Sequence, residues 1–541
     1  MAQSLAPADA AISTSQPPTA LLVAVHKRDE SGIDVREAQP VPESPSLLAR
    51  FNEMLYAVLF FDVTGGRLQP GDGTDLAHQE PVTIPFVIAV LAISAVFLTV
   101  WYGWINIRGF GHALAVVSGR YDNPDDAGDI SHFRALTSAL SGTVGLGNIA
   151  GVAVAIQAGG PGAVFWMVVM AFFGMSAKFS SCTLSQMYRK VHADGSISGG
   201  PMYYLDLGLR QKGGLYAAIG KGCAMLFALM IMGGAIGGGN MFQANQTVEV
   251  LTHTFGLPEQ AKLGLGIGMA CLVGVVILGG IRRIAFVTSR LVPMMCGIYL
   301  LASACVILVY ISRVPDMIAL IISMAFTDNA LFGGVVGVAI MGIRRAAFSN
   351  EAGLGSAAVA HAAAKTDEPT REGLVAMLEP FIDTIVVCMM TALVIIITGV
   401  WEPAAVNTQG GNLGVTLTAE AFRQVLPWFP YILACSIALF AYSTMIAWCY
   451  YGERGWIYLV DHQGGRGQQT VLIFRLIFVG FVVVGAVNTL DDVLDFSDAM
   501  VFSMAFPNLL GSILLAPMVR QEVRAYWHRY RSGGMRVATA S

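Results

Sequence analysis

The sequence predicts an all-α integral membrane protein with about eleven membrane spans, ten of which form two inverted repeats of five. Three observations lead to this fold class. The chain of 541 residues is 55% hydrophobic and only 13% charged, whereas soluble domains carry about 25% charged residues. Apolar runs of roughly 20 residues recur along it, each long enough to cross a bilayer as a helix. Two of these runs are interrupted by glycines and polar residues at corresponding positions of the two halves, as in transporters built from inverted repeats.

The predicted spans lie at 84–106, 134–157, 162–186, 218–246, 262–280, 287–312, 331–362, 374–400, 429–450, 470–489 and 496–519. The first is an extra helix, and the others form the repeats 134–312 and 331–519. Because each repeat has an odd number of spans, the second is inverted relative to the first. Residues 1–80 form a polar N-terminal tail, disordered over 1–45, with an interfacial helix at 47–61. Residues 520–541 form a basic cytoplasmic tail.

Loop charges predict the orientation of these spans. If the N-terminus lies outside, the inside loops hold most of the lysines and arginines, and the C-terminal tail adds Arg520, Arg524, Arg529, Arg531 and Arg536. The outside loops then hold only Lys262, Arg313 and Arg423. This asymmetry is what the positive-inside rule requires. We therefore expect a multi-pass protein of the cell membrane with its N-terminus outside and its C-terminus in the cytoplasm.

The composition argues against several other function classes. A net charge of −4 is too small to indicate a nucleic-acid partner. The eight cysteines contain no CxxC pair and the nine histidines no HxxxH pair, so we predict no metal framework and no cofactor. A membrane-embedded enzyme would need a catalytic set such as a His/Asp cluster, and His132, His192, His253 and His361 are far apart in the sequence.

The first broken span, 135–157, is interrupted by Gly142, Gly145, Gly147 and Asn148. Interior glycines destabilise a helix, and unwound backbone at membrane depth is tolerated only where it is buried in protein or lines a cavity. Unwinding frees amides at 145–148, which suit a carboxylate, and carbonyls at 140–142, which suit a sodium ion. Two other interpretations stay open: the glycines permit close helix packing through Gly147-xxx-Gly151, and Asn148 caps the second half-helix.

The second broken span, 333–363, carries charges between two apolar halves: Arg344, Arg345, Ser349, Asn350 and Glu351, followed by Gly353 and Gly355. Charged groups at membrane depth almost always face the protein interior or water. Ser349 and Asn350 are candidates for substrate contact. Equally, with Glu351, they would cap the following half-helix and neutralise Arg344 or Arg345. A third interpretation makes Glu351 a proton carrier.

Other polar residues at depth are further candidates. Gln243 would orient an amino acid or satisfy backbone opened by its glycine run, with Asn240 and Asn245 as weaker candidates. Ser443 and Thr444 would supply sodium ligands, although hydroxyls in membrane helices usually bond to their own carbonyls. Trp448 would wall a small pocket or pack against lipid or protein. We interpret Asp383 and Thr384 as a helix-start network.

Long, ordered stretches between about 133 and 454 resemble the alanine or glycine:cation symporter family: ALSGTVGLGNIAGVAVAI, GGPGAVFWM, GMSAKF, GGPMYYL, GNMFQANQ, GIRRAAFSNEAGLGSA, FIDT and YSTMIAWCYYGERG. The resemblance implies a fold of the leucine-transporter type with a five-plus-five inverted repeat. It implies that the substrate carboxylate binds at Gly145, Leu146 and Gly147, with Gln243 and Trp448 in the pocket. It also implies a sodium ion among Leu140, Ser141, Val144, Ser443 and Thr444.

This chain departs from the family pattern at one position. It reads GLGN where many members read GTGN, so Leu146 replaces a threonine hydroxyl. The departure leaves only the backbone amides there for binding and favours a smaller or more apolar pocket.

Together these features predict a sodium-driven symporter of a small neutral amino acid, alanine or glycine, that works by alternating access in the bilayer. A proton-coupled amino-acid transporter is the main alternative. A channel or a membrane-embedded enzyme is a weaker one, because an inverted repeat argues against a pore open to both sides at once. We predict no nucleic-acid partner and make no prediction for the oligomeric state or the role of residues 1–80.

Overall fold

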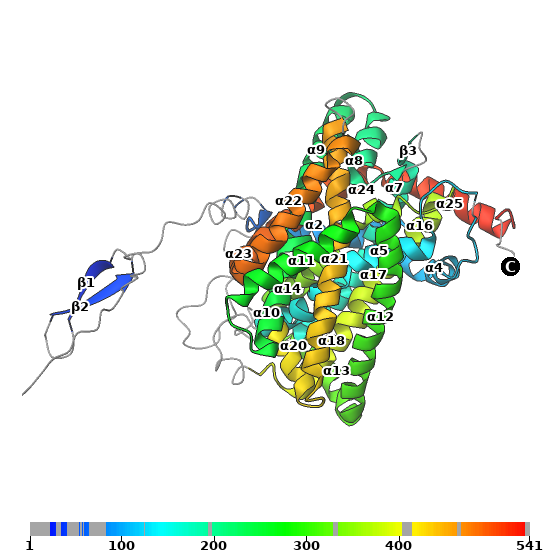
Figure 1. The fold of residues 1–541 in the computed structure, drawn as a ribbon. Coiled ribbons are helices and arrows are strands. Elements are labelled where there is room, and N and C mark those ends of the chain that lie inside the picture. Colours follow the sequence, from blue (N-terminus) through cyan, green and yellow to red (C-terminus); the bar gives the residue numbers. More distant parts are fainter. Residues whose placement is uncertain are drawn as a thin grey trace, which may run out of the picture. The chain divides into compact units, whose positions relative to one another are not determined.

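The structure is a computed structural model, and it describes residues 22–28, 34–40, 54, 57, 59–63 and 83–535, except 124, 193–196, 328–333, 403–413 and 462–466 (Figure 1). The chain divides into two units, Met1–Phe51 and Asn52–Ser541. The first contains an antiparallel hairpin of β1 (Leu22–Arg28) and β2 (Asp34–Pro40), in which Leu22 lies opposite Pro40. The sequence predicts no regular structure there. The interfacial helix predicted at 47–61 lies largely outside the described residues.

The described part of the second unit is helical apart from the short hairpin of β3 (Lys190–Val191) and β4 (Ile197–Ser198). The helices up to residue 325 are α2 (Phe86–Trp101), α3 (Ile105–Arg108), α4 (Phe110–Val117), α5 (His132–Thr143), η1 (Gly147–Gly151), α6 (Val152–Gly159), α7 (Gly162–Met187), α8 (Pro201–Tyr203), η2 (Tyr204–Gly208), α9 (Gly214–Ile236), η3 (Gly237–Met241), α10 (Phe242–Phe255), α11 (Ala261–Ile277), α12 (Gly280–Val309), η4 (Ile311–Arg313) and α13 (Val314–Ala325).

The remaining helices are α14 (Gly334–Asn350), α15 (Ala357–His361), α16 (Pro369–Ala376), α17 (Leu378–Pro380), η6 (Phe381–Cys388), α18 (Met389–Thr398), α20 (Gly414–Arg423), α21 (Phe429–Asp461), α22 (Gly467–Val487), α23 (Leu490–Ser503), α24 (Ala505–Leu514) and α25 (Ala516–Arg531). Segments η1, η2, η3 and η6 are π-helical. Such turns are rare in proteins and are frequent at functional sites.

The described helices include seven that are long and apolar enough to cross a membrane, or eight if the bent pair His132–Thr143 and Gly147–Gly159 is one span. The seven are Gly162–Met187, Gly214–Phe255, Gly280–Val309, Pro369–Thr398, Phe429–Asp461, Gly467–Val487 and Asp492–Leu514. Two predicted spans correspond to shorter apolar helices, α2 and α11. A polytopic all-helical membrane protein is therefore observed, whereas the count of eleven spans stays a prediction.

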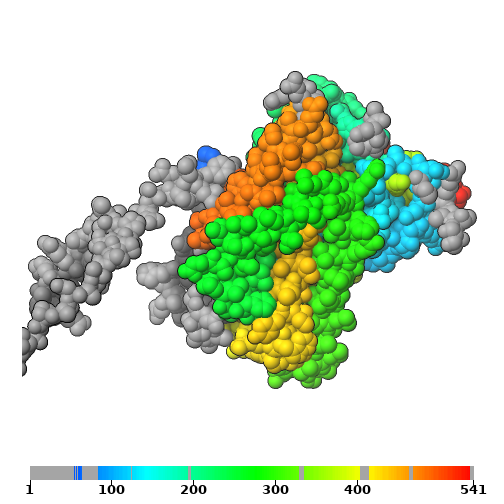
Figure 2. Space-filling view, in the orientation of Figure 1, coloured from blue at the N-terminus to red at the C-terminus, as the bar shows by residue number. Residues whose placement is uncertain are grey.

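Glycines allow the long helices to approach each other closely. A Cβ at Gly455 of α21 would lie 2.7 Å from the Ala228 carbonyl oxygen of α9, and a Cβ at Gly266 of α11 would lie 2.7 Å from the Cβ of Ala486 on α22. Inside a bilayer, small residues at helix contacts allow the backbones of neighbouring helices to pack closely. Figure 2 shows a face formed by α11, α12, α21 and α22. Large apolar side chains, including Leu272, Leu301 and Leu476, are exposed on these helices, as on a surface in contact with lipid.

Candidate functional site

The first predicted interruption is confirmed: the axes of α5 and the η1–α6 segment differ by 54°. Helix α5 ends at Thr143, and Val144 is extended, with φ −76° and ψ 97°. The π-helical turn η1 begins at Gly147, so the break occupies residues 144–146. All of these residues are buried. The glycine-rich sequence thus opens the helix inside the protein.

Asn148 bridges this break. Its Oδ1 accepts a hydrogen bond of 2.8 Å from the Gly145 N–H, one of the amides that the sequence predicts to be free. Its Nδ2 donates to the carboxylate of Asp383 at 2.6 Å and to the Asp383 main-chain oxygen at 3.1 Å. The Asn148 side chain therefore connects the broken segment, through Gly145, to the carboxylate of Asp383.

The second predicted interruption follows α14, which ends at Asn350. Glu351, Gly353 and Gly355 have positive φ values of 55°, 87° and 86°, and α15 begins at Ala357. Glycine is suited to such left-handed positions because it has no Cβ. The Ala352 N–H donates to Asn350 Oδ1 at 2.9 Å. The chain therefore turns sharply between two helices, as the charged and glycine-rich stretch predicts.

One interpretation of the sequence, that Glu351 neutralises Arg344 or Arg345, is wrong, because both arginines pair with Asp498. Both arginines donate to Oδ2 of the buried Asp498 on α23, from their NH2 groups at 2.6 and 3.0 Å. Glu351 instead accepts a hydrogen bond from the Ser356 hydroxyl. The physical reason is distance along the helix. Glu351 lies six and seven residues beyond the arginines, about two helical turns away and past the end of α14.

Asp383 joins the two breaks, and its role differs from the predicted helix-start network. The span Pro369–Thr398 continues through it, and its side chain is fully buried. Its Oδ2 accepts from the Ser349 hydroxyl at 2.9 Å and from Thr384 Oγ1 at 2.7 Å, while Oδ1 accepts from Asn148. Asn350 is tied to the same network because its Nδ2 donates to Thr384 Oγ1 at 2.9 Å.

A small cavity of about 20 Å³ lies between the first break and helices from both halves. Its lining residues are Gly142, Thr143, Gly147, Gly238, Gln243, Phe348, Glu351, Trp448 and Val501. The structure thus brings together three predicted site residues, Gly147, Gln243 and Trp448. Gly145, Leu146, Asn148, Ser349 and Asn350 are buried around it but are not among its lining residues. A volume near 20 Å³ holds about one water molecule, so this is a closed form of the site.

Unpartnered polar atoms gather beside the break. Gln243 Nε2 donates to the Gly238 carbonyl at 3.0 Å. The side chain thus provides a hydrogen bond to a main-chain group of the glycine run, as one of the two interpretations of Gln243 predicts. Its Oε1, together with Thr444 Oγ1 and Tyr451 Oη, is buried without a hydrogen-bond partner in the described part of the chain. A Cβ at Gly145 would lie 2.7 Å from Thr444 Oγ1 and 3.5 Å from Gln243 Oε1. Buried polar atoms without partners are costly, so their convergence indicates a place for a polar ligand or an ion.

Trp448 packs over the same region. Its Nε1 donates to the Gly142 carbonyl at 3.2 Å, and its ring meets that of Tyr451 edge to face, with centroids 5.4 Å apart. The side chain is buried against Gly234, where an added Cβ would lie 3.3 Å from the ring. Trp448 therefore forms a wall of the cavity and does not face lipid.

The predicted sodium ligands are all buried near the break, with different partners. The Leu140 carbonyl accepts from the Val144 N–H at 2.7 Å. The Ser141 hydroxyl donates to the Ser443 carbonyl at 2.7 Å, which ties α5 to α21. The Ser443 hydroxyl bonds back to the Phe440 carbonyl at 2.9 Å, as the alternative interpretation predicts. Among the three side-chain hydroxyls of this set, Thr444 Oγ1 has no hydrogen-bond partner in the described residues.

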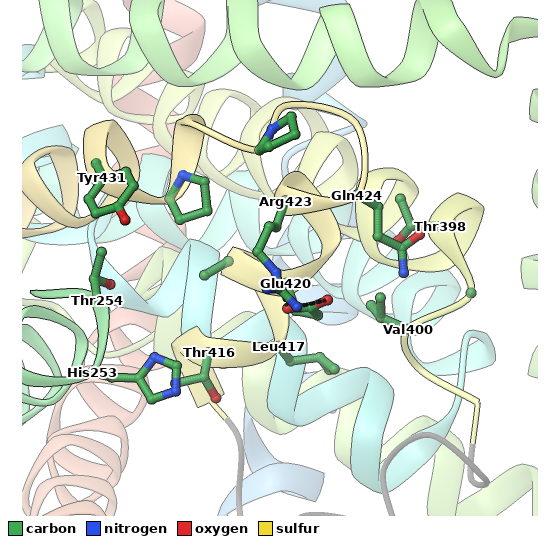
Figure 3. A pocket seen from close by; sticks show the side chains of 14 residues that line it. His253, Thr254, Thr398, Val400, Thr416, Leu417, Glu420, Arg423, Gln424 and Tyr431 are labelled. Carbon is green, nitrogen blue, oxygen red and sulfur yellow. Dashed lines mark hydrogen bonds and ion pairs between the residues drawn. The ribbon is translucent and has the colours of Figure 1, made fainter. Parts of the chain in front are cut away.

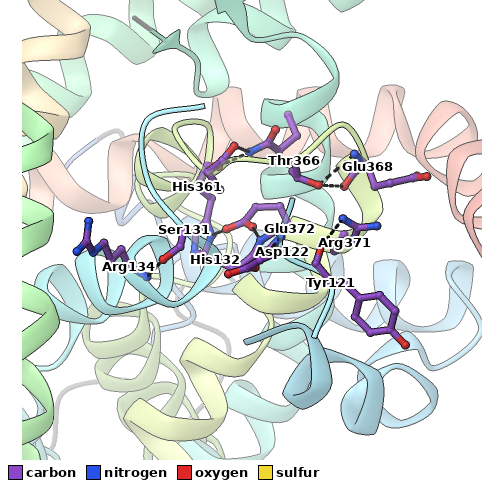
Figure 4. A network of polar contacts seen from close by, with 12 residues as sticks. Tyr121, Asp122, Ser131, His132, Arg134, His361, Thr366, Glu368, Arg371 and Glu372 are labelled. Carbon is purple, nitrogen blue, oxygen red and sulfur yellow. Dashed lines mark hydrogen bonds and ion pairs between the residues drawn. The ribbon is translucent and has the colours of Figure 1, made fainter. Parts of the chain in front are cut away.

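The structure contains a buried charge network that the sequence did not predict, and Figure 4 shows three of its members, His132, His361 and Glu372. Lys178 Nζ and Glu379 Oε2 are 2.6 Å apart, and Glu379 Oε1 meets His361 Nε2 at 2.5 Å. His361 Nδ1 meets Glu372 Oε1 at 2.5 Å, and Glu372 also bonds His132 Nδ1. All five side chains are at most 2% exposed. The sequence contained one signal for this network, because Glu379 is an acidic residue inside the predicted apolar span 374–400. Acidic residues in membrane spans usually have a function or an ion-pair partner.

A separate cavity of about 690 Å³ lies between the ends of α10, α18, α20 and α21 (Figure 3). It shares no lining residue with the small cavity. Glu420 and Arg423 form an ion pair of 2.8 Å at its wall, and both are exposed. Arg423 is the last residue of α20, and it lies between the predicted spans 374–400 and 429–450, where the charge pattern predicts an outside segment.

Apolar spans with broken helices around a buried polar cavity are the architecture of a membrane transporter. The sequence model of the sodium:alanine symporter family matches residues 75–540, and the chain belongs to this family.

Similar proteins include two relatives and one solved structure. The sodium/alanine symporter AgcS of Methanococcus maripaludis is 40% identical over 444 residues, covering 82% of this chain and 94% of AgcS. The putative sodium/proton-dependent alanine carrier protein YrbD of Bacillus subtilis is 33% identical over 83% of this chain and 91% of its own length. The structure of MhsT in complex with L-phenylalanine matches with a TM-score of 0.49 and 13% identity, over 74% of this chain and 99% of MhsT.

Proposed function

We propose that the chain is a sodium-coupled symporter of a small neutral amino acid, alanine or glycine, that works by alternating access. The observation that carries this proposal is the first helix break, where buried polar atoms of Gln243 and Thr444 without partners converge on Gly145. The name of AgcS as a sodium/alanine symporter supports both the ion and the substrate class. The family is one of transporters, so the reaction is movement of a solute and not a chemical conversion.

In this proposal the substrate lies against the first break. The backbone amides of Gly145, Leu146 and Gly147 bind its carboxylate, because a half-helix N-terminus presents donors and a positive dipole end. Gln243 Oε1 accepts from its ammonium group, and the Trp448 ring limits the size of its side chain. Since the cavity measures about 20 Å³, binding must widen it. Release of the Gly145 N–H from Asn148 would supply one donor.

Ser349 and Asn350 lie at the end of α14, next to the second break, and in this proposal they position the substrate site. Their side chains bond to Asp383 and Thr384 at 2.9 Å, which argues for positioning of the substrate site through Asp383. A widened cavity would also bring Ser349 close to the substrate, because its Oγ lies 3.4 Å from where a Cβ at Gly147 would be.

Sodium in this proposal is bound beside the substrate by oxygen atoms, the ligands that hard cations prefer. The carbonyls of Leu140 and Val144 and the hydroxyls of Ser141, Ser443 and Thr444 form the candidate set. Thr444 supports it best, because its buried hydroxyl has no hydrogen-bond partner in the described structure. An ion held between α5 and α21 would order the break, and substrate and sodium would then strengthen each other's binding.

The same proposal includes the finer architecture: a five-plus-five inverted repeat of the leucine-transporter type, preceded by one extra span. The two breaks support it, since each falls in the first span of its predicted repeat. The orientation, with the N-terminus outside and the C-terminus in the cytoplasm, rests on the loop charges.

Proton coupling is a second candidate. It is favoured by the buried network of Lys178, Glu379 and His361, which contains groups that exchange protons. The printed name of YrbD, a putative sodium/proton-dependent alanine carrier, also supports it.

The test is uptake of labelled glycine, L-alanine and D-alanine into proteoliposomes, with sodium and proton gradients imposed separately. We expect a sodium gradient to drive accumulation of L-alanine or glycine with the pH equal on both sides. Accumulation driven by a proton gradient alone would select the second candidate. Equilibration without accumulation under either gradient would exclude symport and favour a channel.

A further inference from the structure

A cavity of about 600 Å³ lies between the end of α2 and the C-terminal helix α25. Four arginines line it: Arg108, Arg520, Arg524 and Arg531. No carboxylate is among its lining residues, and none of these four arginines forms an ion pair in the part of the chain that is described. Its volume is within the range of about 300–1,000 Å³ that is usual for ligand sites. The cavity therefore concentrates uncompensated positive charge.

Three of the four arginines that line the cavity belong to helix α25. Arg520, Arg524 and Arg531 are spaced by four and seven residues, so they lie on one face of the helix. A neighbouring face buries Val519 and Tyr526, and α25 packs against α7 and α16. On that side Arg529 is neutralised, with its NH2 group 2.5 Å from Glu368 and 2.8 Å from Glu522. Only the arginines toward the cavity lack such partners.

The cavity lies where two apolar helices end. The apolar helix α2 ends at Trp101, and the span Asp492–Leu514 ends two residues before α25 begins. Trp101 and Trp527 line the cavity, and the guanidinium of Arg520 lies 5.1 Å from the centre of the Trp101 ring. Tryptophan is enriched at the depth of the lipid headgroups. The cavity is therefore expected at the membrane surface, on the side that the loop charges predict to be cytoplasmic.

Apolar side chains of the segment 100–107, adjacent in sequence to residues that line the cavity but not among its lining residues, remain exposed. Val100 and Ile107 are each 59% exposed, and Trp104 is 43% exposed. Gly103 and Trp104 have positive φ values of 64° and 58°, and this turn leads the chain from α2 into α3 beside the cavity. A ligand with an anionic head and apolar tails would suit both the arginines of the cavity and the exposed apolar side chains of this segment. A free anion would satisfy only the arginines.

The geometry points to a binding site for the phosphate headgroup of an anionic phospholipid, held by Arg108, Arg520, Arg524 and Arg531. Arginine binds phosphate through paired N–H donors in a planar fork. Basic pockets between membrane helices on the cytoplasmic side suit anionic headgroups. The site is independent of the substrate and of the coupling ion, and it would anchor α25 to the bilayer.

The test is binding of phosphatidylglycerol to the purified full-length chain in neutral detergent, followed by native mass spectrometry and by the rise in Tm. Phosphatidylcholine and inorganic phosphate are the comparison ligands. We expect a bound phosphatidylglycerol that neither comparison ligand displaces. In the variant R520Q/R524Q its apparent Kd should rise roughly thirtyfold, since each arginine near the surface contributes about a fivefold effect. The matched control R283Q/R290Q removes two exposed arginines of α12 and should leave the Kd unchanged.

Three results would overturn the site: no preference for phosphatidylglycerol in the wild type, equal weakening in the control variant, or displacement by inorganic phosphate at similar concentrations. The last would indicate a free anion as the ligand. The Tm without lipid should be the same in all variants because these side chains are exposed. If R520Q/R524Q does not fold, R524Q/R531Q tests the same prediction.

Discussion

Asp383 should be the residue whose loss most weakens the link between the two helix breaks. Its carboxylate is fully buried and accepts hydrogen bonds from Asn148, Ser349 and Thr384 at 2.6, 2.9 and 2.7 Å. We consider two substitutions, Asp383→Ala and Asp383→Asn. The first removes the acceptors, and the second keeps the shape and one acceptor while it removes the charge.

The magnitude follows from the donors that each substitution leaves without a partner. In Asp383→Ala the hydroxyls of Ser349 and Thr384 lose their acceptor, at about 1–3 kcal/mol each, whereas Asn148 keeps the main-chain oxygen of residue 383. The expected decrease in the free energy of unfolding is therefore about 2–6 kcal/mol. In Asp383→Asn both hydroxyls can rotate to accept from the new amide, and we expect a decrease of about 1 kcal/mol.

The assay is unfolding of the purified protein in mixed detergent micelles, with uptake measured on the same preparations. Thr398→Ala is the control within the same span, because the Thr398 hydroxyl bonds only within its own helix, to Val394 and Ile395. It should change stability by about 0.5 kcal/mol or less. Equal stability of Asp383→Ala and wild type, or equal losses in the Ala and Asn variants, would refute this reasoning.

Four further predictions follow from the site. Gln243→Ala should abolish alanine uptake with little change in Tm, and wild-type uptake would remove Gln243 from the site. Gly145→Ala should reduce uptake at least tenfold, because its Cβ would lie 2.7 Å from Thr444 Oγ1; Gly151→Ala, whose Cβ would meet nothing within 4 Å, is the control and should transport normally. Sodium should lower the apparent Kd for alanine, measured by calorimetry in sodium and choline buffers, and equal values would contradict coupling. Burial and nearby arginines lower the pKa of His112 from 6.5 to about 4, so the folded protein binds this proton more weakly than the unfolded chain. Stability should therefore fall as the pH drops from about 6.5 toward 4. The fall should be smaller in His112→Gln, and an identical pH profile of Tm in both proteins would count against the assignment.

The sequence predicted the local features of the site well. The interruption of the first broken span was predictable because four helix breakers, Gly142, Gly145, Gly147 and Asn148, fall close together in it. The association of Gly147, Gln243 and Trp448 came from the family resemblance, and the structure places all three around one cavity. Thr444 and Ser443 were correctly placed beside the first break, although the hydroxyl of Ser443 bonds to its own helix.

Long-range pairing was not predictable from one sequence. Arg344 and Asp498 are 154 positions apart, and only the packing of α14 against α23 decides that Asp498, and not the nearby Glu351, neutralises the arginine. The role of Asp383 was missed for a local reason. Pro380 precedes it, and proline usually marks the first turn of a helix, whereas here the span Pro369–Thr398 continues past the proline.

The contacts of His361 determine the net charge of the buried network that it forms with Lys178, Glu372 and Glu379. Both of its ring nitrogens face carboxylate oxygens at 2.5 Å, and ionised carboxylates can only accept, so both nitrogens must carry protons. Two cations, Lys178 and the imidazolium, then offset two anions, Glu372 and Glu379. These four groups together are electroneutral, so none of them is an isolated ion kept out of water. Replacing one member leaves an unbalanced ion among helices, whereas replacing a cation together with an anion keeps the sum at zero.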